Sequence, residues 1–72
     1  MKKQTLTYDI GFEKDGFTSG MGYSTDKDIC IRSIPQMLEE PRCPHLRDFE
    51  GGTIFVCCLQ TGEIVYSQEI PE

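Results

Sequence analysis

Residues 53–59, with the sequence TIFVCCL, are apolar at every position after the threonine. A strand without polar alternation is typical of the interior of a sheet, where both of its faces are covered. The turn-forming sequence QTGE follows, and IVYSQEI then returns with a strand-like pattern. We therefore expect a hairpin over residues 53–70, with its first strand shielded on two sides.

A second hairpin is predicted over residues 4–23. Apolar side chains alternate with polar ones on both sides of the sequence EKDG, and Gly16 suits the left-handed position of a tight turn. The apolar face would carry Leu6, Tyr8, Ile10 and Phe12 on one strand and Phe17, Ser19, Met21 and Tyr23 on the other. The opposite face is almost bare around Gly11, Gly20 and Gly22. It indicates either a twisted or bulged hairpin or a surface on which a partner segment lies.

Residues 25–40 allow two interpretations. Thr25 and Asp28 are spaced as a capping box that would open a single helix, but Pro35 would then lie inside that helix at a cost of about 3 kcal/mol. The alternative is a short strand at ICIR followed by a helix that begins at Ser33, with Pro35 in its first turn. Because the proline penalty is large, we predict the short strand and short helix, over residues 28–40.

The predicted architecture is a single α+β domain over residues 1–72. A small antiparallel sheet, made of two β-hairpins and a short middle strand, packs on one short helix, and residues 41–52 form a loop. One short helix covers only one face of such a sheet. We therefore expect a second copy of the chain or another protein to cover the other face, and a homodimer is the more common arrangement.

The balance of charges excludes several classes of function. The formal net charge is −5, and no run of lysine and arginine follows Lys2 and Lys3, so direct binding to nucleic acid is not expected. No apolar run is long enough to predict a secretion signal or a membrane span. We expect a cytoplasmic protein with reduced cysteines and with no cofactor.

The segment PRCPHLRD, residues 41–48, has the composition of a reactive site. Cys43 has basic neighbours that would lower a thiol pKa, and Cys43, His45 and Cys57 would offer sulfur and nitrogen ligands to zinc. The ligand spacing matches no common zinc motif, and no hydrolase or phosphate-binding motif occurs. A thiol- or zinc-dependent module centred on Cys43 and His45 is thus an alternative prediction.

The leading prediction is a small acidic protein, not an enzyme, that binds another protein. It would act as an inhibitor or regulator of the kind that phages and mobile elements encode, by surface occlusion or by mimicry of nucleic acid toward a basic partner. A structural homodimer or accessory subunit is the other alternative. The residues predicted to bind the partner are Glu13, Asp15, Asp26, Asp28, Arg42 and Arg47.

Overall fold

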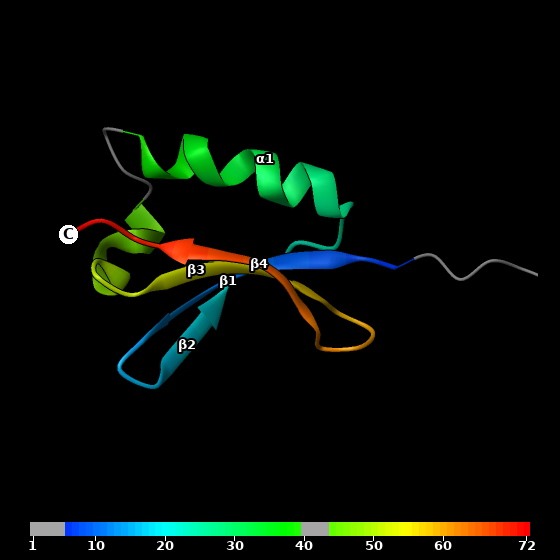
Figure 1. Cartoon of the computed structure of the whole chain (residues 1–72), viewed down its shortest axis with the longest axis horizontal. Coiled ribbons are helices and arrows are strands. Elements are labelled where there is room, and N and C mark those ends of the chain that lie inside the picture. Colours follow the sequence, from blue (N-terminus) through cyan, green and yellow to red (C-terminus); the bar gives the residue numbers. More distant parts are fainter. Residues whose placement is uncertain (1–5, 40–43) are drawn as a thin grey trace, which may run out of the picture.

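The computed structural model describes residues 6–39 and 44–72. They form a four-stranded antiparallel sheet with one α-helix and a short 3-10 helix packed against it, which confirms the predicted α+β class (Figure 1). The order of the strands across the sheet is β2-β1-β3-β4. The elements along the chain are β1 (Tyr8–Lys14), β2 (Phe17–Gly20), α1 (Lys27–Leu38), η1 (Pro44–Phe49), β3 (Thr53–Cys58) and β4 (Ile64–Glu69).

Both predicted hairpins are confirmed. Asp15 and Gly16 connect β1 to β2 with positive φ angles of 53° and 83°, as a two-residue hairpin turn requires. The backbone N–H of Gly16 donates to Glu13 Oε2 at 2.8 Å, which closes this turn further. The second hairpin joins β3 to β4 through the predicted QTGE turn, in which Gly62 has a φ of 79°.

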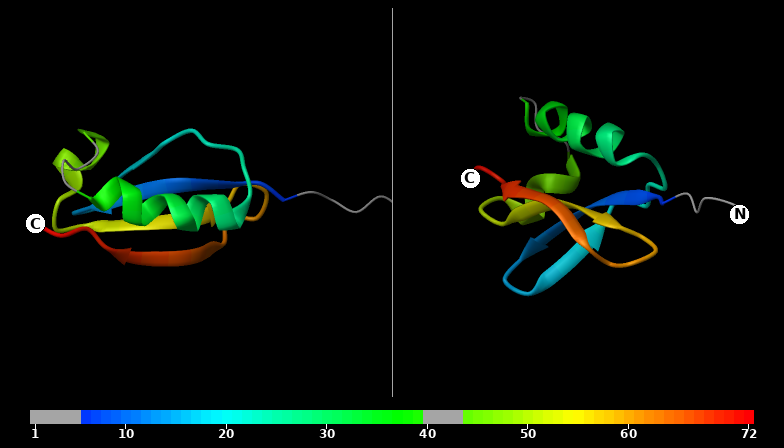
Figure 2. Two further views of the ribbon diagram at one scale, coloured as in Figure 1. Left: turned by 90° about the horizontal axis from the view of Figure 1, so that it is seen from above. Right: turned by 45° about the vertical axis from the view of Figure 1, so that its right-hand side comes forward.

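The hydrophobic core lies between the sheet and the two helices. It contains Ile10 and Phe12 of β1, Ile54 and Val56 of β3, Cys30 and Ile34 of α1, Leu46 and Phe49 of η1, and Ile70. Both helices lie on the same face of the sheet, as the two views of Figure 2 show. The strands therefore bury one set of alternate side chains against these helices and direct the other set away from them.

The predicted strand and short helix at residues 28–40 are wrong. Residues 27–38 form one helix instead, α1, whose N-cap is Asp26 and which contains Pro35. Cys30 and Ile34 are four residues apart on one face of this helix and are completely buried, and a buried isoleucine side chain contributes about 1.5–3 kcal/mol. Pro35 is exposed, so water can reach the Ile31 carbonyl that loses its N–H donor. The burial of the apolar face thus outweighs the proline penalty.

No side-chain capping bond forms at the start of α1, where Asp26 is the N-cap. The hydroxyl of Ser33 donates instead to the Ile29 carbonyl, one turn earlier in the helix, at 2.8 Å. The predicted loop at residues 41–52 also needs correction, because η1 occupies residues 44–49 and brings Leu46 and Phe49 into the core.

Candidate functional site

The four acidic residues predicted to bind a partner lie at two separate places. Glu13 and Asp15 are at the end of β1, whereas Asp26 and Asp28 are at the beginning of α1. The chain before α1 is joined to the start of β1, because Tyr8 and Thr25 exchange backbone hydrogen bonds of 2.7 and 3.2 Å. The six residue steps of β1 span about 20 Å, so the two acidic pairs form no common patch.

Of the predicted basic residues and zinc ligands, the structure describes Arg47, His45 and Cys57, and it does not bring His45 and Cys57 together. Arg47 and His45 are exposed on η1, on the helix side of the sheet. Cys57 lies near the other end of β3 and faces the opposite side. Arg42 and Cys43 lie outside the described residues. Within residues 6–39 and 44–72 no three His, Cys, Asp or Glu side chains are grouped as a metal site.

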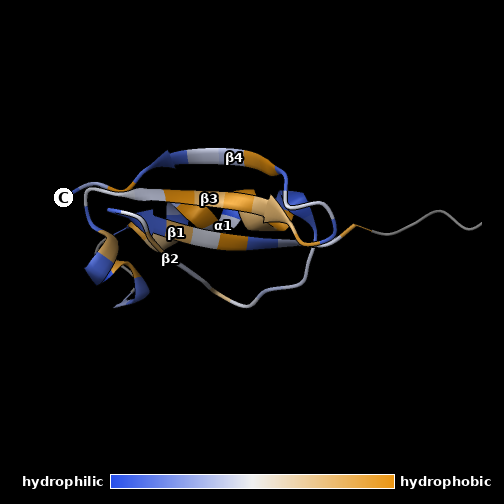
Figure 3. Cartoon of the chain, turned by 90° about the horizontal axis from the view of Figure 1, so that it is seen from below, coloured by the Kyte–Doolittle hydropathy of each residue, from blue (hydrophilic) through white to orange (hydrophobic). Residues whose placement is uncertain are grey.

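The face of the sheet opposite the helices is not covered by any described element, and we call it the open face (Figure 2). The strand registers place its side chains in three rows that run across the sheet. Each row is given in the strand order β2, β1, β3, β4. The first row is Thr18, Glu13, Thr53 and Glu69, and the second row is Gly20, Gly11, Phe55 and Ser67. The third row has no β2 residue and consists of Asp9, Cys57 and Ile64. Figure 3 views the sheet from this side and shows apolar β3 between more polar neighbours.

Phe55 fills the bare part of the open face. A Cβ atom added to Gly11 would lie 2.5 Å from two carbons of the Phe55 ring, so this ring rests directly on the Gly11 backbone. A Cβ atom on Gly20 would lie 3.1 Å from Asp9 Oδ2. The space above Gly11 and Gly20 is therefore occupied by side chains of the same chain, whereas a Cβ atom on Gly22 would meet nothing within 4 Å.

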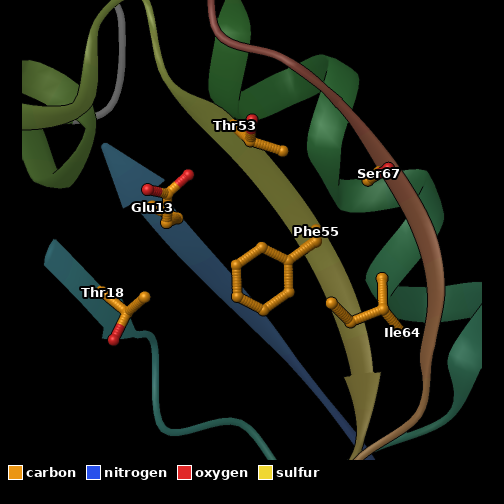
Figure 4. Close-up of a pocket in the computed structure, with 6 residues that line it drawn as sticks. All are labelled: Glu13, Thr18, Thr53, Phe55, Ile64 and Ser67. Atoms are coloured by element: carbon orange, nitrogen blue, oxygen red, sulfur yellow. The ribbon is translucent and has the colours of Figure 1, made fainter. Parts of the chain in front are cut away.

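A hollow of about 310 Å³ lies beside the Phe55 ring on the open face. Its lining combines two apolar side chains with three hydroxyls and one carboxylate, drawn from all four strands (Figure 4): Glu13, Thr18, Thr53, Phe55, Ile64 and Ser67. Ile64 is 57% exposed in this position. Such a solvent-exposed isoleucine next to a half-buried aromatic ring offers an apolar contact to a second molecule.

The charged side chains of the open face are all acidic. The alternation of β1 and β4 places Asp9, Glu13 and Glu69 there, and no lysine or arginine of the four strands shares this face. Asp9 is held by the chain itself, since its carboxylate accepts hydrogen bonds from the backbone N–H groups of Gly22 and Tyr23 at 3.3 and 2.8 Å. Glu13 lines the hollow and accepts one hydrogen bond from the Gly16 N–H, and Glu69 lies in the same row on β4.

A smaller hollow of about 210 Å³ lies on the outer side of α1. It is lined by Ile29, Arg32, Ser33 and Gln36. The Arg32 side chain bonds through Nε to the Asp28 carbonyl at 3.4 Å, within the same helix. This hollow follows one helix only and collects no group from a second element.

The thiols of the described residues differ in their environment. Burial raises the pKa of Cys30 and of Cys57, and the Asp9 carboxylate raises both further. Cys58 has a lowered pKa, chiefly because the Thr61 side chain hydrogen-bonds to it at the β3–β4 turn. Cys58 is only 3% exposed, however, and no described imidazole approaches it, so the arrangement lacks the base that an activated nucleophile needs.

The sequence indicated that one face of the sheet would be uncovered, but it did not indicate that this face would be acidic. The two-sided apolar pattern of residues 53–59 indicated a strand face that the helices would not cover. The position of Glu13 and Glu69 on that face follows from the pairing of β3 with both β1 and β4, which no local pattern encodes.

Comparison of the chain with protein-family models, with curated proteins and with solved structures finds no match. Among the described residues, no helix has the length and apolar character needed to cross a membrane.

Proposed function

We propose that this protein is a non-enzymatic binding module that recognises another protein through the open face of its sheet. The observation that carries the proposal is the hollow between Phe55 and Ile64, which lies on the one sheet face that no described element covers. A small domain buries a limited part of its surface, and a contiguous apolar area at its exterior typically marks an interaction site.

The proposed mode of action is occlusion. The module would lie flat against its partner and cover a functional surface there, as an inhibitor or regulator does. Mimicry of nucleic acid is the less favoured form of this proposal, because Glu13 and Asp15 are separated from Asp26 and Asp28 by the length of β1. We include a cytoplasmic location in the proposal, since the three cysteines among the described residues are free thiols, which suit a reducing compartment.

Two matched variants test the location of the binding surface. Ile64→Ser removes the exposed apolar side chain of the open face, and Ile29→Ser removes a similar one, 45% exposed, from the outer side of α1. Each immobilised protein is incubated with an extract of the cells that produce it, and the retained proteins are quantified by mass spectrometry after circular dichroism has verified the fold.

We expect wild type and Ile29→Ser to retain the same protein, and Ile64→Ser to lose most of it. Equal retention by both variants would show that the open face is not the binding surface, and the proposal would be wrong.

A further inference from the structure

We infer that the occupant of the open face is a basic amphipathic helix of another protein. This inference rests on the proposed function and specifies the chemistry of the partner. The helix would place an apolar side chain in the hollow beside Phe55 and Ile64, and two lysine or arginine side chains beside Glu13 and Glu69.

The acidic charges of the open face indicate that the partner is basic. Glu13 and Glu69 both belong to the row that runs through Thr53, with β3 between them. Two strand spacings separate their backbones by about 10 Å, close to the Debye length at physiological salt. Each carboxylate therefore acts as a separate site for a cation, and no basic strand residue on this face neutralises either of them.

The apolar part of the face determines where the helix lies. The row containing Phe55 and Ser67 is two residues along the strands from the Glu13 row, a step of about 6.6 Å. Ile64 lies on the far side of Phe55 from the two glutamates. A helix presents residues three and four positions apart on one face at a similar spacing, so one of its faces can reach both the glutamates and the hollow.

A second copy of this chain fits the open face poorly. In a symmetric contact the same surface meets itself, so Asp9, Glu13 and Glu69 of one copy would meet a surface that carries the same three carboxylates. No lysine or arginine of the strands is available there to separate these carboxylates. Nucleic acid is excluded by the same charge, because its phosphates would meet an acidic face.

The test uses two synthetic helical peptides of 16 residues, one built from leucine, alanine and lysine, and one with every lysine replaced by glutamate. Each is titrated into the isotope-labelled full chain while amide NMR shifts and affinity are recorded. Two double variants are compared: Glu13→Gln with Glu69→Gln on the open face, and Asp28→Asn with Glu39→Gln at the two ends of α1. Each pair removes two negative charges, and the glutamine at position 13 keeps an oxygen that can accept the Gly16 N–H.

We expect the lysine peptide to bind, with amide shifts concentrated at Thr53, Phe55 and Ser67, and the glutamate peptide not to bind. The open-face pair should weaken binding about fivefold, as the loss of two exposed ion pairs does, and the α1 pair should change it less than twofold. Equal weakening by both pairs, or shifts centred on α1, would overturn the inference.

The failure of this inference can be distinguished from the failure of the proposed function. If Ile64→Ser abolishes capture of the natural partner while Glu13→Gln with Glu69→Gln does not weaken it, the open face binds a partner that is not basic. Sedimentation of the protein alone should show a monomer at micromolar concentration. A dimer that Ile64→Ser dissociates would instead identify a second copy as the occupant and overturn the inference.

Discussion

The packing of Phe55 on Gly11 gives the most direct test of the open face. Gly11→Ala adds one methyl group at a position where the backbone φ is compatible with any residue, because Gly11 is not among the residues with positive φ. The new Cβ atom would lie 2.5 Å from ring atoms Cε2 and Cζ, whereas ordinary contacts are 3.4–4 Å. The Phe55 ring must therefore move outward by about 1 Å.

The expected change in stability follows from two opposing terms. Overpacking of this kind costs about 1–3 kcal/mol. The replacement of a strand glycine by alanine returns about 0.5–1 kcal/mol, because the unfolded chain loses conformational freedom. We expect a net destabilisation of about 0.5–2 kcal/mol for Gly11→Ala.

The assay is urea unfolding of a double-mutant cycle with Phe55→Ala. Removal of the ring removes the clash, so Gly11→Ala should be neutral or slightly stabilising in the Phe55→Ala background. The coupling free energy between the two positions is expected to be about 1–2 kcal/mol. If Gly11→Ala has the same effect in both backgrounds, the ring does not rest on Gly11 and the description of the open face is wrong.

Three further predictions concern the helix, the thiols and the segment after β2. Pro35→Ala restores a hydrogen bond to the Ile31 carbonyl at an exposed position and should stabilise the protein by about 1–2 kcal/mol, measured as a higher Tm; an unchanged or lower Tm would contradict this. Burial keeps the Cys30 thiol protonated at a pH where the unfolded thiol ionises, so its contribution to stability is complete below about pH 9 and is lost as the pH rises through the raised pKa. Cys30→Ala should flatten the decline in urea stability as the pH rises above about 9, and a curve parallel to wild type would refute the assignment. Asp9→Ala removes the carboxylate that accepts hydrogen bonds from the Gly22 and Tyr23 N–H groups after β2. Hydrogen exchange of the Tyr23 amide should become about tenfold faster, with no comparable change in the β3 amides. Equal changes in both would indicate global destabilisation instead.

Local sequence signals were sufficient for both hairpins. The alternation around Ile10 and Phe12, and the turn residues Asp15, Gly16 and Gly62, encode strand and turn within a few neighbouring residues. The backbone geometry of a tight turn is a property of its own residues, and therefore no distant contact was needed to predict it.

The helix over residues 27–38 and the acidic open face were decided by tertiary structure. Pro35 disfavours a helix locally, and only the burial of Cys30 and Ile34 against the sheet outweighs it. In the same way, Glu13 and Glu69 are 56 residues apart in sequence and come to one face because β3 pairs with both of their strands. The sequence alone determined the two hairpins, because their strands and turns depend on short-range conformational preference. The tertiary structure decided which distant residues lie together on one face, because burial and strand pairing depend on contacts between residues that are far apart along the chain.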